Sequence, residues 1–330
     1  MEPRALPWGD EISLPGSSDT RLLLIAGFGS GPETLRALGQ RVHDRTGASV
    51  VITPLAAHRG DTGAFYRSRA WHYLREAERR FLTLWEERRA PVLLGGYSTG
   101  ALVALLIGAR HPAKVAGLVL VSPALRLSAT SKQLVGYSFG SVYYFGLPVG
   151  MLLTVAGLAW QARKRGWTRE RQWLRQAGSF SAFAAAALAL RRITVPLNTG
   201  GPMTRDGEEV LPPHFARASL ATGSTLVPLQ LAARWQLSRM ELPICFVYGG
   251  DDAVVDVRFT RLRVARRPRA ELHIVPRAPH RVVTVEGCHT IVAGFVARTA
   301  AGRRAAEARP DGVDERAMPP LADLRGDAGA

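Results

Sequence analysis

The chain has 330 residues, of which 47% are hydrophobic and 21% are charged. This composition excludes a disordered, collagen-like or disulfide-rich chain, and the length allows two domains or one domain with an insertion. The net charge is +16, and all but three of the basic residues are arginine. Such a charge fits a nucleic-acid or anionic-membrane partner, and it fits a simple compositional bias equally well. The first residues lack the basic and apolar regions of a secretory signal, which predicts a cytoplasmic protein.

Six short apolar runs have the length and composition of buried parallel strands. They span residues 22–26, 50–53, 92–95, 118–121, 244–248 and 272–275. Helical patterns lie between or after most of them, over residues 33–45, 67–88, 101–110 and 284–299. This alternation predicts an α/β protein with a mostly parallel sheet and helices on both of its faces.

The alternation stops between residues 125 and 241, which is far too long a gap for a structureless loop. We therefore expect a large, mainly helical inserted cap over residues 126–240, which is apolar and then rich in arginine. The core would comprise residues 21–125 and 241–302. Residues 1–20 and 303–330 have no sustained apolar period, so we expect a flexible N-terminus and a disordered C-terminal tail.

The third apolar run leads into Gly96-Tyr97-Ser98-Thr99-Gly100, which matches the Gly-x-Ser-x-Gly pattern of a nucleophile elbow. A sharp strand-to-helix turn would hold the Ser98 hydroxyl above the carboxyl ends of the strands. Side chains at positions 96 and 100 would collide there, which explains both glycines. The same pattern occurs around Ser138, but no apolar strand precedes it. Context therefore favours Ser98 as the nucleophile.

A serine nucleophile needs a base and an acid that orients the base. Asp251 and Asp252 follow the fifth apolar run, and both are candidates for the acid. His280 follows the last run, in a loop that would lie over the same edge of the sheet. His289 is the main rival base, although it lies in a helical pattern. Both cysteines, Cys245 and Cys288, lack metal-binding spacing, so we expect no disulfide framework and no metal.

Acyl transfer also needs hydrogen-bond donors for the oxyanion that develops on the substrate. The backbone N–H of Thr99, directly after the nucleophile, is one candidate. The second is the N–H of Phe28, in a glycine-rich loop after the first apolar run. That loop fits neither a dinucleotide fingerprint nor a P-loop, so a nucleotide role is not expected.

Taken together these residues resemble the α/β-hydrolase fold. The likeness is to bacterial carboxylesterases and monoacylglycerol lipases, the serine aminopeptidase-like branch, and it covers about residues 20–125 and 241–300. The family pattern Gly-x-x-Asp-x-x-Val aligns with Gly249, Asp252 and Val255, which selects Asp252 as the acid. Ala26 stands where the family's usual His-Gly-Phe has histidine. The stretch at 54–60 is similar to the family's Pro-x-x-x-Gly-His-Gly, and we expect its His58 to be structural. The resemblance implies no cofactor.

The predicted cap contains a 19-residue uncharged stretch, 142–160, followed by basic residues. It has the length of a membrane span but contains three glycines and a proline. Four roles for this stretch stay open: a hydrophobic cover over an acyl pocket, shallow docking on an anionic membrane, part of a transmembrane hairpin, or packing in an ordinary core. A second basic run, at 258–269, would suit a lipid surface or an ordinary solvated face. Nothing suggests a nucleic-acid module.

The function expected from these residues is that of a serine hydrolase acting on carboxylic esters with an apolar acyl chain. Two other readings remain open. The acyl-serine could pass its acyl group to another acceptor or arise from a small amide, or the chain could be a non-catalytic lipid-surface binding protein on the same fold. The substrate would be a small-molecule or lipid ester.

Overall fold

The computed structural model describes residues 4–128, 193–197, 202–205, 208–265 and 267–307. Its centre is a seven-stranded sheet in the order β12-β11-β6-β5-β3-β4-β2. The strands are β2 (Ile12–Leu14), β3 (Arg21–Ile25), β4 (Ser49–Thr53), β5 (Val92–Tyr97), β6 (Val115–Val121), β11 (Ile244–Gly249) and β12 (Ala270–Val275). Every neighbouring pair is parallel except β2 and β4, which are antiparallel.

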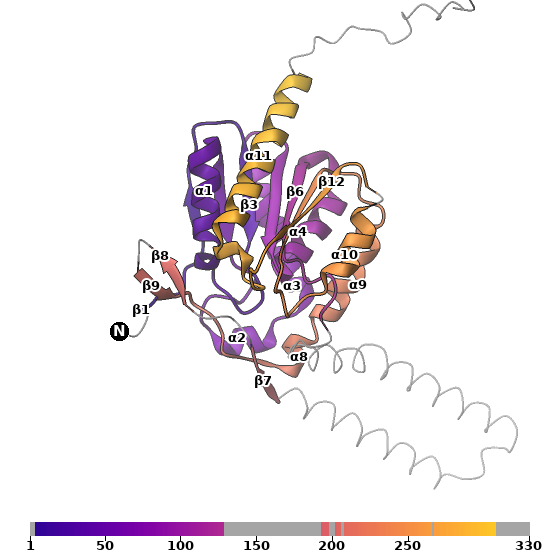
Figure 1. Ribbon diagram of the computed structural model, residues 1–330. Coiled ribbons are helices and arrows are strands. Elements are labelled where there is room, and N and C mark those ends of the chain that lie inside the picture. The colour runs from indigo at the N-terminus through magenta and orange to yellow at the C-terminus, as the bar shows by residue number, and fades with distance from the viewer. Residues whose placement is uncertain (1–3, 129–192, 198–201, 206–207, 266, 308–330) are drawn as a thin grey trace, which may run out of the picture.

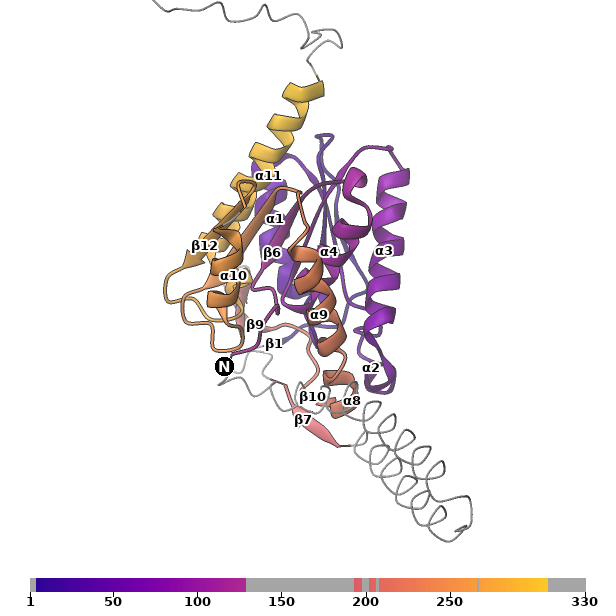
Figure 2. The same cartoon turned by 90° about the vertical axis from the view of Figure 1, so that its right-hand side faces the viewer.

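Helices cover both faces of this sheet (Figures 1 and 2). One face carries α1 (Arg36–Thr46) and α11 (Glu286–Glu307). The other carries α3 (Ala70–Glu86), α4 (Thr99–Arg110), α9 (Leu226–Leu237) and α10 (Val257–Val264). The shorter helices are η1 (Pro32–Leu35), α2 (Thr62–Arg67), η2 (Pro112–Lys114), α8 (Leu220–Gly223) and η4 (Val282–Thr284). The expected α/β class with helices on both faces is therefore confirmed.

Alternation within the strands divides the core into two apolar layers. In β3, Leu23 and Ile25 enter the layer under α3 and α4, whereas Leu22 and Leu24 enter the layer under α1 and α11. All four are essentially inaccessible to solvent. Burying each such side chain contributes roughly 2–3 kcal/mol, which explains why the runs are apolar on both faces.

All six expected strands are present, with ends shifted by three residues at most. Two expected helices differ in their bounds. The first, expected over residues 33–45, is a 3-10 turn followed by α1, and the second, expected over 67–88, is α3, which begins only after the separate helix α2 has ended at residue 67. Between α2 and α3, Ser68 is extended, and its hydroxyl contacts Phe65 O and the Tyr73 hydroxyl. These side-chain hydrogen bonds replace the backbone hydrogen bonds of a continuous helix, so the chain turns at Ser68.

The expectation of a flexible N-terminus is wrong for residues that pair with other strands. Strand β2 forms the sheet edge against β4, and its Ile12 is buried in the core. Residues 11–14 alternate polar and apolar, which is the pattern of an edge strand. Strand β1 (Arg4–Ala5) pairs with β9 (Glu208–Leu211), far along the chain. Long-range pairing orders this segment, and a two-residue strand carries no sequence signal.

The predicted boundary between cap and core, at residue 241, assigns helix α9 to the cap, whereas the structure places it in the core. Helix α9 packs against α4 through Leu229, Ala233 and Leu237, in the same apolar layer as the sheet. The described part of residues 126–240 also contains short strands: β7 (Thr194–Pro196), β8 (Met203–Arg205), β9 and β10 (Arg217–Ser219). Residues 129–192, most of the predicted cap, lie outside the described residues, as does the predicted tail from residue 308. Helix α11 extends past residue 302.

Candidate active site

Ser98 occupies a sharp turn between β5 and α4 at the carboxyl edge of the sheet. Its backbone has φ 54° and ψ −111°, a strained conformation for a residue with a side chain. The Ser98 N–H donates to Val121 O at 2.9 Å, which ties the turn to the end of β6. Only 9% of the residue is exposed. The turn therefore presents one hydroxyl in a fixed place, as the sequence predicts for an elbow.

The elbow glycines permit this turn because no side chain fits at either position. A Cβ on Gly96 would lie 2.5 Å from the Gly100 carbonyl carbon. A Cβ on Gly100 would lie 2.2 Å from Ile25 O, at the end of β3. The first glycine thus lets strand and helix pass each other, and the second lets α4 begin against the neighbouring strand.

His280 joins Ser98 to Asp252. Its Nε2 lies 3.2 Å from Ser98 Oγ, and its Nδ1 lies 2.8 Å from Asp252 Oδ2. The three residues come from loops that follow β5, β11 and β12, and parallel strands bring these loops to one edge of the sheet. The structure therefore brings together the three side chains that the sequence analysis selected.

The two neighbouring carboxylates have different environments. The Asp252 side chain is only 2% exposed, and its Oδ1 accepts hydrogen bonds from Val254 N at 2.9 Å and Val255 N at 3.0 Å. These bonds orient the carboxylate toward His280. Asp251 is exposed. Of the two candidates left open by the residues themselves, Asp252 is the one that contacts the histidine.

Gly249, which the sequence analysis used only for alignment, brings the two loops together. A Cβ at this position would lie 2.3 Å from Ala278 O and 2.3 Å from Pro279 O. The loop that carries His280 therefore crosses directly over the end of β11. The missing side chain is the local signal that marks this crossing.

The two expected oxyanion donors lie beside the elbow. Thr99 is the first residue of α4, so its N–H belongs to the helix-terminal groups without an intrahelical partner. Phe28 lies in the loop after β3. Within the described residues, neither N–H has a recorded hydrogen-bond partner. Both amides therefore stay candidates for the oxyanion donors.

Residues 212–215, which belong to the predicted cap, hold the loop of Phe28 in place. Phe215 N donates to Gly29 O at 2.8 Å, and Gly31 N donates to Pro213 O at 2.9 Å. A Cβ on Gly31 would lie 2.7 Å from the Pro213 ring, so the two segments are in close contact. The sequence does not predict this clamp, because nothing in residues 212–215 by themselves indicates what they contact.

Comparison with solved structures identifies the architecture. A metagenome-derived lipolytic enzyme from a study of LipS and LipT superposes with a TM-score of 0.62 at 16% identity, over 92% of this chain and 100% of that one. A monoacylglycerol lipase of Paleococcus ferrophilus superposes with a TM-score of 0.56 at 14% identity, over 88% of this chain and 98% of that one. A soluble variant of the Saccharomyces cerevisiae monoglyceride lipase superposes with a TM-score of 0.55 at 13% identity, over 87% of this chain and 89% of that one.

The chain has the α/β-hydrolase fold. A family model described as serine aminopeptidase, S33, matches residues 63–192, a range that includes Ser98. The resemblance to monoacylglycerol lipases and esterases is thereby confirmed. Comparison with curated protein sequences gave no significant match. Among the described residues of this hydrolase fold, no helix has both the length and the hydropathy of a membrane span.

His58 lies beside the loop of Phe28, and its surroundings differ entirely from those of His280. The residue is fully buried, and the rings of Phe28, Phe65, Tyr73 and Phe215 surround it with centroid distances of 4.9–6.0 Å. Its Nδ1 lies 2.8 Å from Ala56 O, and its Nε2 has no partner among the described residues. Burial lowers the pKa of His58 to about 4. The ring is therefore neutral at pH 7 and packs as part of an aromatic cluster.

The remaining candidates lie elsewhere or cannot be placed. His289 is buried, and its Nε2 lies 2.7 Å from Val283 O, so it does not contact Ser98. Burial also lowers the pKa of His289. Ser138 lies outside the described residues. Tyr97 packs against His280 with ring centroids 5.3 Å apart, and burial raises the pKa of its phenol above the usual range.

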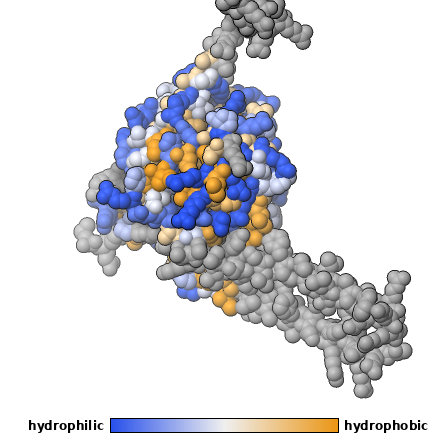
Figure 3. All heavy atoms as spheres, turned by 45° about the vertical axis from the view of Figure 1, so that its right-hand side comes forward, coloured by the Kyte–Doolittle hydropathy of each residue, from blue (hydrophilic) through white to orange (hydrophobic). Residues whose placement is uncertain are grey.

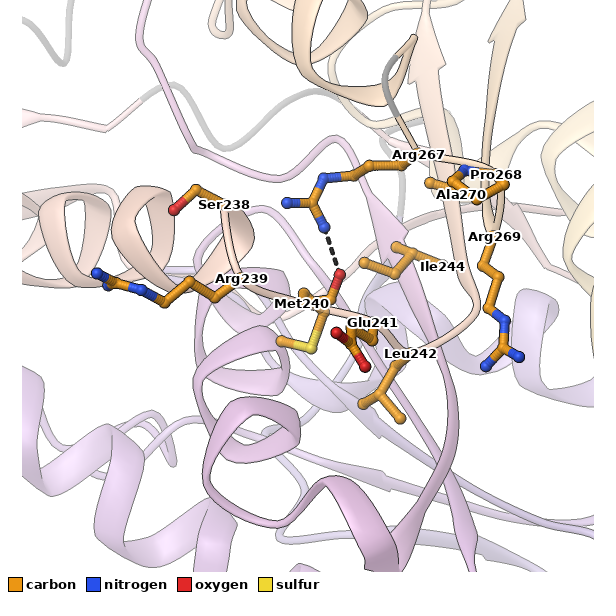
Figure 4. A pocket seen from close by; sticks show the side chains of 10 residues that line it. All are labelled: Ser238, Arg239, Met240, Glu241, Leu242, Ile244, Arg267, Pro268, Arg269 and Ala270. Carbon is orange, nitrogen blue, oxygen red and sulfur yellow. Dashed lines mark hydrogen bonds between the residues drawn. The ribbon is translucent and has the colours of Figure 1, made fainter.

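Two polar features of this hydrolase fold lie away from the elbow. Cys245, Glu271 and His273 place their potential ligand atoms within 4.8 Å of one another. However, Arg298 binds Glu271 at 2.8 Å and 3.0 Å, and burial raises the pKa of the Cys245 thiol, so we assign no metal there. A cavity of about 450 Å³ lies at the amino ends of β11 and β12, at the edge opposite Ser98 (Figure 4).

Proposed function

We propose that the chain is a serine hydrolase that cleaves carboxylic esters through an acyl-serine intermediate. The observation that carries the proposal is the unbroken contact from Ser98 Oγ through His280 to Asp252, at 3.2 Å and 2.8 Å. A serine hydroxyl is a poor nucleophile at neutral pH, and a hydrogen-bonded imidazole overcomes this by accepting its proton.

The contacts support a definite tautomer for the resting site. Asp252 accepts a hydrogen bond from His280 Nδ1–H, which leaves Nε2 unprotonated and able to accept the Ser98 O–H. Because Asp252 Oδ1 is already held by two backbone amides, the carboxylate is anchored before substrate arrives. It then stabilises the imidazolium that forms when His280 takes the proton.

In the first half-reaction, Ser98 Oγ forms a bond to the ester carbonyl carbon as its proton passes to His280 Nε2. The N–H groups of Phe28 and Thr99 hold the negative oxygen, and loss of one such donor typically costs about 3–4 kcal/mol of transition-state stabilisation. The tetrahedral intermediate breaks its bond to the alcohol oxygen, which receives the proton from His280. In the second half, water attacks the acyl-serine by the same route and releases the acid.

An apolar acyl chain is the substrate feature that we favour. Solved structures with the same fold include proteins described as a monoacylglycerol lipase and a monoglyceride lipase. Residues 133–162 contain no charged side chain, which suits a cover over a hydrocarbon chain, although they lie outside the described residues. Rates for p-nitrophenyl esters of increasing acyl length, with and without liposomes, would test this preference.

A fluorophosphonate probe tests the nucleophile directly. Wild type should be labelled on Ser98, and Ser98→Ala should not be labelled. Ser122→Ala is the matched control, because Ser122 is also buried with a positive φ of 40° at the end of the neighbouring β6, and its hydroxyl has no partner among the described residues. Equal labelling of wild type and Ser98→Ala would refute the assignment.

Product analysis separates hydrolysis from its alternatives. Adding competing alcohols or amines would divert the acyl group if the chain is an acyltransferase, and short amides would be turned over if it is an amidase. A protein that binds liposomes equally with and without Ser98, and turns over no short ester, would be a lipid-binding protein on a hydrolase scaffold.

A further inference from the structure

Three large hydrophobic side chains are exposed on two neighbouring helices of the core. Leu231 is 40% exposed and Trp235 is 56% exposed, both on α9, and Leu262 on α10 is 72% exposed. Leu231 and Trp235 are four residues apart, so they lie on the same face of their helix. Single exposed hydrophobic residues are ordinary, but several gathered on adjacent elements mark an interaction surface.

The two helices form a continuous surface. The Arg234 guanidinium of α9 lies 5.1 Å from the centroid of Phe259 on α10, and Arg263 lies 3.7 Å from the same ring. Figure 2 shows the helices side by side, outside the sheet. On the side that Figure 3 brings forward, hydrophobic residues reach the surface among hydrophilic ones. We call the outer surface around Leu231, Trp235 and Leu262 the α9–α10 face.

The charge of this region is strongly positive. Residues 226–241 and 256–269 contain eight arginines and two carboxylates. One of the carboxylates, Asp256, accepts a hydrogen bond from Arg258 N at 3.0 Å and pairs with Arg126 at 3.6 Å. The other, Glu241, lines the cavity of Figure 4 together with three arginines, Arg239, Arg267 and Arg269. An excess of one sign over adjacent helices attracts a partner of the opposite sign.

We infer that the α9–α10 face docks on an anionic lipid bilayer. Leu231, Trp235 and Leu262 would enter the boundary between headgroups and acyl chains, where tryptophan is favoured. The exposed arginines, among them Arg239, Arg258 and Arg261, would contact lipid phosphates while their aliphatic stems lie along apolar surface. Arg239 stacks over Trp235 at 3.7 Å, so one cation and one indole already face the same side. This partner goes beyond the proposed reaction, and docking does not require Ser98.

Other partners explain less of the surface. A second copy of the chain would bring two arginine-rich faces together, which like-charge repulsion opposes. A nucleic acid would satisfy the arginines but would leave the two leucines without a favourable contact. A bilayer with anionic headgroups uses both the charge and the hydrophobic side chains.

Vesicle flotation with the full chain tests the inference. Wild type should float with vesicles of phosphatidylcholine and phosphatidylglycerol, and only weakly with phosphatidylcholine alone. The triple variant Leu231→Ser, Trp235→Ser, Leu262→Ser should bind the anionic vesicles at least tenfold more weakly, because it loses the buried apolar area. Arg258→Gln and Arg261→Gln should each reduce binding to the anionic vesicles by about fivefold.

Trp71→Ser is the matched control, because Trp71 is 57% exposed on α3 and stacks on His72 rather than on an arginine. It should bind as wild type does. Unchanged melting temperatures and unchanged fluorophosphonate labelling would show that the variants fold. Equal vesicle binding by wild type and the triple variant, a loss for Trp71→Ser as large as that of the triple variant, or no wild-type binding would overturn the inference. Concentration-dependent dimerisation that the triple variant abolishes, without vesicle binding, would assign the face to a second copy.

Discussion

His280 and His58 both follow carboxyl ends of sheet strands, but their surroundings are opposite. Each ring nitrogen of His280 has a polar partner, Ser98 on one side and Asp252 on the other. His58 has one backbone partner and four aromatic rings, and its second nitrogen is unpartnered among the described residues. The difference shows that the partners of a histidine, more than its place beside an active site, decide whether it can move a proton.

The regions around His280 and His58 also have different roles. Around His280, polar atoms from three loops converge on the Ser98 hydroxyl, the proposed nucleophile. Around His58, aromatic side chains fill the space behind Phe28, so the loop that carries the proposed oxyanion donor rests on a packed surface. We regard the first region as the chemical part of the site and the second as its support. Four substitutions test this division.

The largest effect should come from Asp252→Asn. An asparagine would favour the wrong histidine tautomer, and we expect kcat for a short ester to fall by about 10⁴-fold while folding is preserved. Asp251→Asn is the matched control, since that side chain is exposed and should change kcat little. Steady-state kinetics on both variants would measure the contrast, and equal losses would show that the wrong carboxylate has been chosen.

Phe215→Ala should mainly lower stability. Phe215 stacks on Phe65 with ring centroids 4.1 Å apart, and it is buried beside His58. Truncating a buried phenylalanine costs about 3–5 kcal/mol, and we expect a loss in this range from urea unfolding. The variant keeps the Phe215 N–H that donates to Gly29 O, but loss of the ring would let residues 212–215 and the loop of Phe28 shift, so kcat should fall while KM changes little. A stable variant with normal kcat would show that the cluster does not support the loop.

His58→Leu should alter how stability depends on pH. In the folded chain the pKa of His58 is lowered from 6.5 to about 4, so below pH 6.5 the unfolded chain binds a proton that the folded chain excludes. Stability from this group is therefore present above pH 6.5 and is lost as the pH falls toward 4, by about 3 kcal/mol in all. Unfolding free energies at pH 7, 5.5 and 4.5 should fall less steeply for the variant. The same pH dependence of the unfolding free energy in wild type and variant would show that the lowered pKa does not belong to His58.

Ala57→Gly should have the smallest effect, and a favourable one. Ala57, next to His58, has a φ of 62°, a region that disfavours residues with a Cβ. Glycine removes that strain but gives up conformational entropy, so we expect stabilisation of about 1 kcal/mol or less. Thermal unfolding would measure it. Clear destabilisation would show that the Ala57 methyl group packs in the support region and outweighs the strain.

Much of the core was predictable because its signals are local. Continuous apolar runs such as 22–26 and 118–121 identify strands that are buried on both faces, and the glycines at 96 and 100 identify the elbow through sterics. That Ser98, the acid and the histidine meet at one edge then follows from where parallel strands end. The assignment of Asp252 over Asp251 needed the family resemblance, because adjacent carboxylates look alike in sequence.

What the sequence by itself determined, then, is the strands, most helices, the elbow and the candidate residues, because backbone sterics and side-chain periodicity act within a few residues. The tertiary structure alone decided that β1 pairs with β9, that residues 212–215 clamp the loop of Phe28, that α9 belongs to the core, and that His58 stands among aromatic rings. Those contacts join segments far apart in the chain. The free energy of each such contact depends on residues that are distant in the sequence, so no local sequence pattern predicts it.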